Sequence, residues 1–268
     1  MDKVIKPDLS IIIPTYNNQS FLKTAIDSIL SNTKLKLEII IIDDGSESNE
    51  LKEYFKTDRA FRFLKIFKII CNEKNIGYLK SVNKGISFCS AQYILLINND
   101  VFVPPQAIEN MLKSLIENPN FGAVGPYSNF AFPNQCLKLE YTDPLTNPYD
   151  LFKKLKKLGN IEPPYQEIAY LSGFCLMLRK DVIDIVSIDG KLFDEIYEYG
   201  YFEDSDLCLR IRGLGYKLII IRNSYIHHYG SKTFSQEKQR EYLIKNYATF
   251  YNKWGSQITS EEIASQIY

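Results

Sequence analysis

The sequence predicts an α/β protein with a doubly wound, mostly parallel sheet. Short and mostly apolar runs at residues 9–13, 37–42 and 93–97 are typical of buried strands, and each ends in polar residues. Amphipathic segments with a 3.6-residue period follow, so that strand–helix units fill roughly the first 118 residues. Alternating strands and helices of this kind build a parallel sheet with right-handed crossovers and helices on both faces.

The first unit begins with residues 9–13 and is interrupted by Pro14, which lacks the amide hydrogen that a strand ladder needs. Thr15, Tyr16 and Asn17 follow at the strand end. The helix expected next carries one buried stripe, formed by Phe21, Leu22, Ala25, Ile26, Ile29 and Leu30. The residues between strand and helix are therefore the first candidates for ligand contact.

The second strand, residues 37–42, is closed by Asp43, Asp44 and a Gly-Ser turn. One of these carboxylates is suited to accept a hydrogen bond from a nucleobase or a ribose hydroxyl. An Asp-Gly turn with a capping serine explains the same pattern equally well. Residues 51–62 are predicted to form a polar surface helix, and residues 63–71 a third, weaker strand.

A turn at Asn75 and Gly77 leads into a helix, and the strand after it ends in Asn98, Asn99 and Asp100. A lone hard carboxylate at the carboxyl end of a strand suits Mg²⁺ or Mn²⁺ held between protein and a diphosphate. The alternative is a capping aspartate in the turn to the next helix. Polar residues at three successive strand ends share one edge of a parallel sheet, which favours the ligand interpretation.

The second half of the chain has a less regular pattern. We expect a short strand at residues 121–126 and a long loop over the cleft at residues 127–165. Within that loop, residues 151–158 form an amphipathic helix with four lysines. Packing of its leucines on the core is the favoured interpretation, and a peripheral contact with an anionic membrane is the alternative. Residues 169–178 are expected to form a strand in which Gly173 permits close backbone approach.

Acidic residues crowd the start of the helix expected after residue 202. A helix dipole favours carboxylates in its first turn, and Asp206 with Arg210 forms an i, i+4 pair. This structural explanation suits Asp206 and Arg210. It accounts less well for Glu203 and Asp204, because these two lie at the cap and face whatever lies beyond the helix.

The two histidines of the chain, His227 and His228, are adjacent in a predicted strand. Adjacent strand residues point to opposite faces, so at most one of them reaches the cleft. An imidazole there would complete a coordination sphere with Asp100 and favour Mn²⁺. Residues 236–252 are predicted to be a helix, and a capping-box pattern at residues 259–262 predicts a last short helix that packs on the core or on a partner chain of a homo-oligomer.

Composition excludes several classes of protein. The chain has 268 residues with 32 Lys+Arg and 32 Asp+Glu, so there is no basic field for nucleic acid. Its five cysteines show no paired or metal-type spacing, as expected in a reducing compartment. Without a secretory signal or a bilayer-spanning run, we expect a cytoplasmic protein, with a peripheral location at the inner face of the membrane as the alternative. Because no Gly-x-Gly-x-x-Gly or Walker A sequence occurs, a bound phosphate is expected to need a metal.

Taken in order, the polar motifs resemble those of one known family. The motifs are Ser10–Asn17, Asp43–Ser46, Asn75–Gly77, Asn98–Asp100, Glu203–Asp206 with Arg210, and His228–Ser231. Over residues 8–235 this series resembles the family 2 glycosyltransferases, which are inverting enzymes of the GT-A fold. The resemblance implies a Rossmann-like doubly wound sheet followed by a C-terminal acceptor-binding half.

The resemblance also implies roles for single residues. Those around the nucleotide-sugar would be Pro14, Thr15, Tyr16, Asn17, Asp43, Asp44, Asn75, Gly77, Asn98 and Asn99. Among these, Tyr16 would stack on the base, and Asp44 rather than Asp43 would bind the base or ribose. Asp100 and His228 would contact Mn²⁺ or Mg²⁺ on the diphosphate, and Asp204 would be the general base. Asn98 stands where the family's Asp-x-Asp motif has a carboxylate.

The implied reaction moves a hexosyl or deoxyhexosyl group from a UDP- or dTDP-sugar to a hydroxyl of a glycan, lipid-linked or glycoprotein acceptor with inversion. The implied context is bacterial cell-surface glycan synthesis or adhesin glycosylation. Residues 1–126 would form the donor half, residues 127–235 the acceptor-binding and catalytic half, and residues 236–268 the C-terminal helices of one continuous domain. Two alternatives stay open: a sugar-phosphate nucleotidyltransferase, whose Gly-rich basic loop is missing after the first strand, and a non-catalytic glycan-binding or scaffold protein.

Overall fold

The computed structural model of the protein describes residues 6–47, 67–137, 143–158, 161–230 and 236–259. The strands are β1 Leu9–Thr15, β2 Leu37–Asp43, β3 Phe67–Cys71, β4 Tyr93–Ile97, β5 Val101–Phe102, β6 Phe121–Tyr127, β7 Tyr165–Ile168, β8 Cys175–Arg179, β9 Lys217–Tyr225 and β10 His227–His228. The helices are α1 Gln19–Asn32, α4 Tyr78–Ile86, α5 Ala107–Glu117, α6 Pro148–Leu155, α7 Lys180–Val186, α8 Glu203–Gly213 and α9 Gln236–Trp254, with a 3₁₀ turn at Pro133–Gln135.

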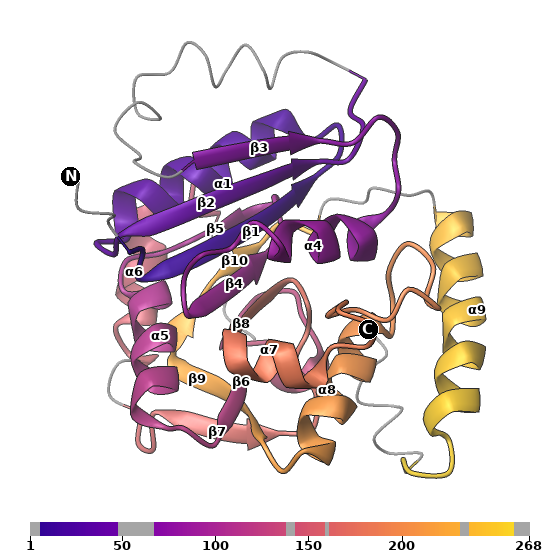
Figure 1. Ribbon diagram of the computed structural model, residues 1–268. Helices are drawn as coiled ribbons and strands as arrows, with labels where there is room; N and C mark the ends of the chain where they lie inside the picture. The colour runs from indigo at the N-terminus through magenta and orange to yellow at the C-terminus, as the bar shows by residue number, and fades with distance from the viewer. Residues whose placement is uncertain (1–5, 48–66, 138–142, 159–160, 231–235, 260–268) are drawn as a thin grey trace, which may run out of the picture.

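An eight-stranded sheet in the order β3-β2-β1-β4-β8-β6-β9-β7 crosses the molecule (Figure 1). β1 pairs in parallel with β2 and β4, and β2 pairs in parallel with β3. The predicted parallel, doubly wound sheet is therefore confirmed for the first half. The expected helix at residues 51–62 lies outside the described residues, as does most of the short helix expected near the C-terminus.

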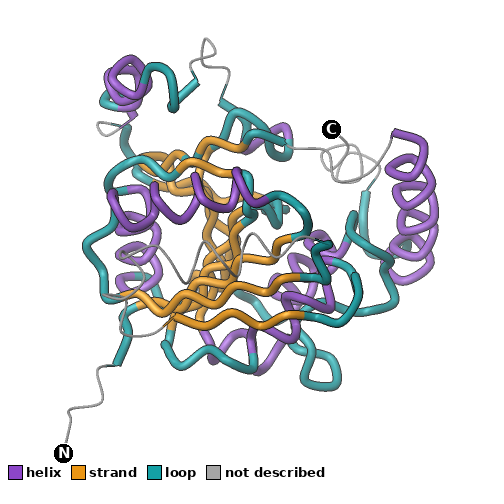
Figure 2. Tube along the Cα trace, turned by 90° about the horizontal axis from the view of Figure 1, so that it is seen from above, coloured by secondary structure: helices purple, strands orange, loops and turns teal. Residues whose placement is uncertain are grey.

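Both faces of the sheet are covered, which explains why its strands are apolar along their whole length. In β1, Ile11 and Ile13 face the core layer that contains α1 and α5. Ile12, between them, faces the opposite layer with α4, α7 and α8. Figures 1 and 2 show these two helical layers on either side of the strands. Alternate residues of one strand thus serve two separate cores.

The second half mixes strand directions. β8 is antiparallel to both β4 and β6, whereas β6 and β9 run parallel and β7 closes the edge antiparallel to β9. The expected long loop at residues 127–165 is only partly irregular, because it holds a 3₁₀ turn, α6 and the start of β7. A separate antiparallel pair of β5 and β10, which the sequence did not suggest, joins the segment after β4 to the histidines.

The lysine-rich helix α6 packs on the protein. Leu151 of α6 and Leu158 just after it are buried in one cluster with Tyr225, and Leu155 packs against that cluster, so the structural interpretation of this helix is confirmed. Its leucines are consequently not displayed for insertion into a lipid surface. In the part of the chain that the structure describes, no helix is long and apolar enough to cross a bilayer.

Helix α9 stands at one side of the molecule and is anchored through a buried carboxylate on α8 (Figure 1). Asp206 is fully buried and accepts hydrogen bonds from Arg210 Nε at 2.8 Å and Trp254 Nε1 at 2.8 Å. Lys253 Nζ lies 2.7 Å from the same carboxylate. The predicted pair of Asp206 and Arg210 is thus present, and it also ties the last turn of α9 to the first turn of α8.

Replacing Asp206 by alanine is expected to lower the free energy of unfolding by ~3–5 kcal/mol, because Arg210 and Lys253 lose their buried counter-charge. Urea unfolding monitored by circular dichroism measures this loss. Asp27→Ala is the matched control, since its pair with Lys23 lies exposed on α1 and is expected to contribute less than ~1 kcal/mol. Equal losses in the two variants would contradict the anchoring role.

Candidate functional site

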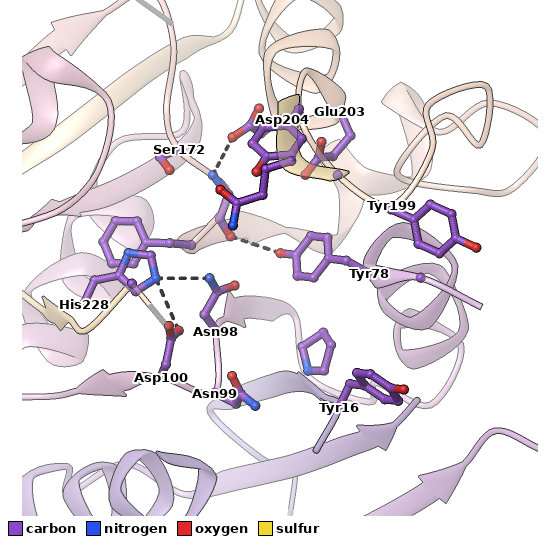
Figure 3. A pocket seen from close by; sticks show the side chains of 18 of the residues that line it. Tyr16, Tyr78, Asn98, Asn99, Asp100, Ser172, Tyr199, Glu203, Asp204 and His228 are labelled. Carbon is purple, nitrogen blue, oxygen red and sulfur yellow. Dashed lines mark hydrogen bonds and ion pairs between the residues drawn. The ribbon is translucent and has the colours of Figure 1, made fainter. Parts of the chain in front are cut away.

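A cavity of about 600 Å³ opens where β1 and β4 end and α8 begins. Its walls come from both halves of the chain (Figure 3). The residues predicted from the sequence that line it are Pro14, Thr15, Tyr16, Asp44, Asn75, Gly77, Asn98, Asn99, Asp100, Asp204 and His228. Parallel strands that end on one edge bring the segments after β1, β2 and β4 together, and α8 and β10 add Asp204 and His228.

Asp44 builds one wall of the cavity by holding a turn. Its carboxylate accepts hydrogen bonds from Asn72 Nδ2 at 2.8 Å, from the Ile76 amide at 2.9 Å and from the Gly77 amide at 2.9 Å. Gly77 has a φ of 91°, a region that side-chain-bearing residues rarely adopt, so glycine suits this turn. The Asn75–Gly77 motif and Asp44 therefore form one hydrogen-bonded unit at the start of α4.

Asn17 and Asp43 are not among the residues that line the cavity, so their contact with a ligand stays a prediction. The Asn17 amide donates to Ser46 Oγ at 3.0 Å, and Asn17 Oδ1 accepts from the Glu47 amide at 2.9 Å. Asp43 Oδ1 accepts from the Ser46 amide at 3.1 Å. The Asn17 side chain ties the loop after β1 to the loop after β2. The Asp43 side chain closes the turn after β2.

Asn99 is oriented by the end of β1. Its Nδ2 donates to Thr15 Oγ1 at 2.8 Å, and both residues are buried. Asn98 is held through its backbone, whose amide donates to the carbonyl of Phe174 at 2.8 Å. The residues before Asp100 are thus locked to neighbouring strands on both sides.

Asp100 and His228 meet across the β5–β10 pair. His228 Nε2 lies 3.2 Å from Asp100 Oδ1 and 3.3 Å from Asn98 Nδ2 (Figure 3). On the other side of the ring, Nδ1 lies 2.9 Å from the carbonyl oxygen of Phe130, which can only accept, so Nδ1 carries the hydrogen. In the neutral ring, the Nε2 lone pair therefore faces the Asp100 carboxylate.

This pair fits a divalent cation. An imidazole Nε2 and a carboxylate oxygen converge, while the second ring nitrogen donates to a carbonyl, which is the usual support of a metal-binding histidine. The imidazole also stacks on Phe174, with 4.8 Å between ring centroids. Among the described residues no group of three or more His, Cys, Asp or Glu is placed to hold a metal. A cation here would take its remaining ligands from substrate and water.

The structure answers which histidine faces the cavity. His227 does not line it, and its Nδ1 lies 3.2 Å from the hydroxyl of Tyr225. Burial lowers the pKa of His227 to about 4, so its ring is neutral at physiological pH. The alternation of adjacent strand residues is confirmed, with His228 on the cavity side.

Asp204 lies in the first turn of α8 and points at the backbone of Gly173. Its Oδ2 accepts the Gly173 amide at 2.9 Å, and Oδ1 accepts the Ser205 amide at 2.8 Å. A Cβ on Gly173 would lie 3.3 Å from the Asp204 Cβ, so the predicted close backbone approach at this glycine is confirmed. Burial raises the pKa of Asp204 to about 6, although the two amides oppose the rise.

Glu203 also lines the cavity, although it was not among the predicted site residues. Burial, followed by the charge of Asp204, raises the pKa of Glu203 well above its usual value. Within the described residues, its Oε2 is buried without a hydrogen-bond partner. The sequence signal was its place at the helix cap beside Asp204, but spacing alone did not separate their roles.

A strained aromatic loop forms the far wall. Tyr199, Tyr201 and Phe202 have φ values of 58°, 73° and 69°, a left-handed conformation that is rare for bulky residues. Asn246 of α9 holds the loop, because its Nδ2 donates to the carbonyls of Glu198 at 2.8 Å and Gly200 at 2.6 Å. Sequence reasoning missed this wall because tyrosines in an irregular segment have no period to read.

Comparison with known proteins identifies the family of the chain. A family model described as glycosyl transferase family 2 matches residues 10–186, which is more than half of the chain. The chain belongs to glycosyl transferase family 2. The resemblance inferred from the motifs is thereby confirmed.

Several glycosyltransferases of this kind are similar in sequence. An uncharacterized glycosyltransferase of Methanocaldococcus jannaschii is 27% identical over 90% of this chain and 80% of its own. An uncharacterized glycosyltransferase of Haemophilus influenzae is 32% identical over 48% of this chain and 39% of its own. Glycosyltransferase GlyA of Streptococcus pneumoniae is 26% identical over 72% of this chain and 28% of its own. This chain thus covers less than half of the Haemophilus influenzae and Streptococcus pneumoniae relatives.

Two solved structures confirm the GT-A fold. GalNAc-T7, crystallised with UDP, GalNAc and Mn²⁺, aligns over 93% of this chain and 48% of its own with a TM-score of 0.67 and 16% identity. The mannosyltransferase PcManGT of Pyrobaculum calidifontis, in complex with GDP-Man and Mn²⁺, aligns over 92% of this chain and 64% of its own with a TM-score of 0.64 and 16% identity. At 16% sequence identity, the similarity to these two structures establishes the fold alone.

Asp204→Asn is expected to raise the melting temperature by roughly 2–4 °C at neutral pH, because the buried charge disappears. The folded-state pKa is raised, so wild-type stability falls as pH rises from about 4, the unfolded value, to about 6. The difference in melting temperature between the variant and the wild type should therefore grow from about pH 4 to about pH 6 and stay constant above that. Calorimetry across pH measures it, with the exposed Asp184→Asn as control. A difference in melting temperature that does not change between pH 4 and pH 7.5 would contradict the raised pKa.

Proposed function

We propose that this protein transfers a sugar from a nucleotide-sugar to an acceptor hydroxyl with inversion, assisted by Mn²⁺ or Mg²⁺. The observation that carries the proposal is that the Asp204 carboxylate and the Asp100–His228 pair face one cavity at the ends of parallel strands. A base for the acceptor and ligands for a cation on the diphosphate are the two groups that a single displacement requires. The similarity to structures crystallised with nucleotides and Mn²⁺ supports this proposal.

Asp204 is proposed as the general base. A pKa of about 6 leaves it ionised at neutral pH and still basic enough to accept a proton. The acceptor oxygen attacks the anomeric carbon as its proton passes to Asp204, and the bond to the diphosphate breaks on the opposite face. One base and no covalent nucleophile suffice, so the configuration inverts.

Asp100 and His228 are proposed to hold the cation. When bound, a divalent cation supplies positive charge that stabilises the departing diphosphate. The protein keeps His228 oriented through Phe130 and Phe174, so that its Nε2 and Asp100 Oδ1 converge. Asn98, in place of a carboxylate, adds no charge; its Nδ2 lies 3.3 Å from His228 Nε2 and would give up this contact when the Nε2 lone pair binds the cation.

The donor nucleoside is proposed to lie between the end of β1 and the turn held by Asp44. Pro14, Thr15 and Tyr16 form one side, with Tyr16 available to stack on the base, and the Asn75–Gly77 turn forms the other. We propose that residues 1–126 bind the donor, residues 127–235 bind the acceptor and carry the base, and residues 236–268 complete one continuous domain. Asn246 of α9 holds the carbonyl of Gly200, which illustrates how the C-terminal part supports the proposed acceptor-binding part.

The proposed donors are UDP- or dTDP-linked hexoses or deoxyhexoses, and the proposed acceptors are glycans, lipid-linked sugars or glycoproteins of the bacterial cell surface. Relatives that support this setting include a poly-beta-1,6-N-acetyl-D-glucosamine synthase of Staphylococcus epidermidis, 30% identical over 43% of this chain, and a chondroitin synthase of Pasteurella multocida, 30% identical over 44%. The proposed place of action is the cytoplasm, including the inner face of the membrane where lipid-linked acceptors lie.

We expect the melting temperature of the protein to show which nucleotide the donor carries. UDP, dTDP, GDP and CMP are tested with and without Mn²⁺, and one of them should raise the melting temperature more strongly with the metal, because a ligand of the folded state stabilises by mass action. At a hundredfold excess over Kd the stabilisation is ~2.7 kcal/mol. Asp100→Asn should remove the metal-dependent part only. No shift with any nucleotide would argue for the scaffold alternative.

Asp204→Asn is expected to reduce transfer by ~10²–10⁴-fold, since the acceptor proton has no base, while nucleotide affinity stays within a few-fold of wild type. Turnover with the identified donor and calorimetric binding of its nucleotide separate the two effects. Asp184→Asn on the exposed face of α7 serves as control for both. Unchanged turnover in Asp204→Asn would refute the assignment of the base.

A further inference from the structure

Gly173, whose amide orients Asp204, is itself held from the donor side of the cavity. Gly173 donates its amide to Asp204 Oδ2 at 2.9 Å. The carbonyl oxygen of the same residue accepts a hydrogen bond from the hydroxyl of Tyr78 at 3.1 Å. Figure 3 shows Tyr78 reaching across the cavity to this backbone, with Asp204 on its far side. One residue without a side chain thus lies between two hydrogen bonds.

Gly173 needs such support because its own geometry gives little. Glycine has more freedom in φ and ψ than any other residue, so its amide direction depends on what holds its neighbours and its carbonyl. The residues on either side are held separately, the Ser172 amide by Gln135 Oε1 at 3.0 Å and the Phe174 carbonyl by the Asn98 amide at 2.8 Å. At Gly173 itself, the carbonyl oxygen is held by the hydrogen bond from the Tyr78 hydroxyl.

Tyr78 is fixed at its other end by the proposed donor site. It is the first residue of α4, directly after Gly77, whose amide donates to Asp44 Oδ2 at 2.9 Å. Its ring packs against Phe193 with 5.9 Å between centroids. Burial, with the nearby acids, raises the pKa of Tyr78 well above its usual value, so its hydroxyl remains a donor over the whole working pH range.

We infer that Tyr78 is a positioning residue, whose hydroxyl holds Gly173 so that the Gly173 amide points at Asp204 and keeps its carboxylate in place. The inference rests on the proposed function for the role of Asp204 as base. It adds a physical link between the two halves of the cavity: Asp44 holds the turn, the turn begins α4, and Tyr78 of α4 binds the carbonyl of Gly173, the residue whose amide orients the base. Nucleotide binding and base geometry then share one hydrogen-bonded path.

Tyr78→Phe tests the hydroxyl alone, because the ring and its packing on Phe193 remain. We expect kcat to fall about ten-fold, as for the loss of one hydrogen bond of ordinary strength, with the donor KM within about two-fold of wild type. The amide of Gly173 favours the ionised carboxylate, so a loosened amide should move the acid limb of the pH–rate profile upward by roughly half a unit. Tyr149→Phe, on an exposed tyrosine of α6, is the matched control.

A double-mutant cycle makes the inference independent of turnover. Tyr78→Phe, Asp204→Asn and the double variant are compared by their urea midpoints, and the two substitutions should be non-additive because they act on one chain of hydrogen bonds. Additive midpoints, or an acid limb that does not move when kcat falls, would overturn the positioning role. A wild type that lacks turnover with every donor but shows a non-additive cycle would overturn the proposed transfer and leave the positioning role standing.

Discussion

The parallel pairing of β1 with β2 and with β4 is the constraint on which the cavity depends. The register places Thr15 opposite Asp43 and aligns Ile12 with Leu96, so the polar residues after each strand emerge at one edge. Strands of opposite direction would have sent these residues to opposite ends of the sheet. The hydrogen bond from Asn99 to Thr15 and the turn held by Asp44 both exist because that edge is shared.

A second constraint is the free energy that it costs to bury two consecutive carboxylates. Glu203 and Asp204 begin α8, and burial raises the pKa of both. The backbone before them adds strain, because Phe202, the N-cap residue directly before the helix, has a φ of 69°. The surrounding structure offsets this cost through bonds that are remote from the cavity, above all the Asp206 network and the grip of Asn246 on the preceding loop. The C-terminal helix is therefore part of what makes the cavity stable.

Much of this architecture could be predicted from the sequence, for identifiable physical reasons. Apolar runs such as residues 9–13 and 93–97 have one stable solution, a strand covered on both faces, and their polar ends then have to share an edge. Asp100 and Asp204, which line the cavity, drew attention through their place at a strand end and at a helix cap, and His228 as one of two adjacent histidines in a predicted strand. Asn17 and Asp43 also follow strands but do not line the cavity, because a polar residue at a strand end can brace a loop as well as face a ligand. Tyr78 gave no signal, since its hydroxyl acts on a peptide far along the chain.

The central position of β8 has a consequence for how the molecule forms. β8 fills the gap between β4 and β6, although β6 precedes it in the chain by about fifty residues. Until residues 175–179 have been added during synthesis, the edge of β4 is unpaired and the two parallel portions of the sheet are not joined. Pairing over such separations closes long loops and slows folding. A nascent chain therefore exposes an apolar strand edge for which early protection by a chaperone is an advantage.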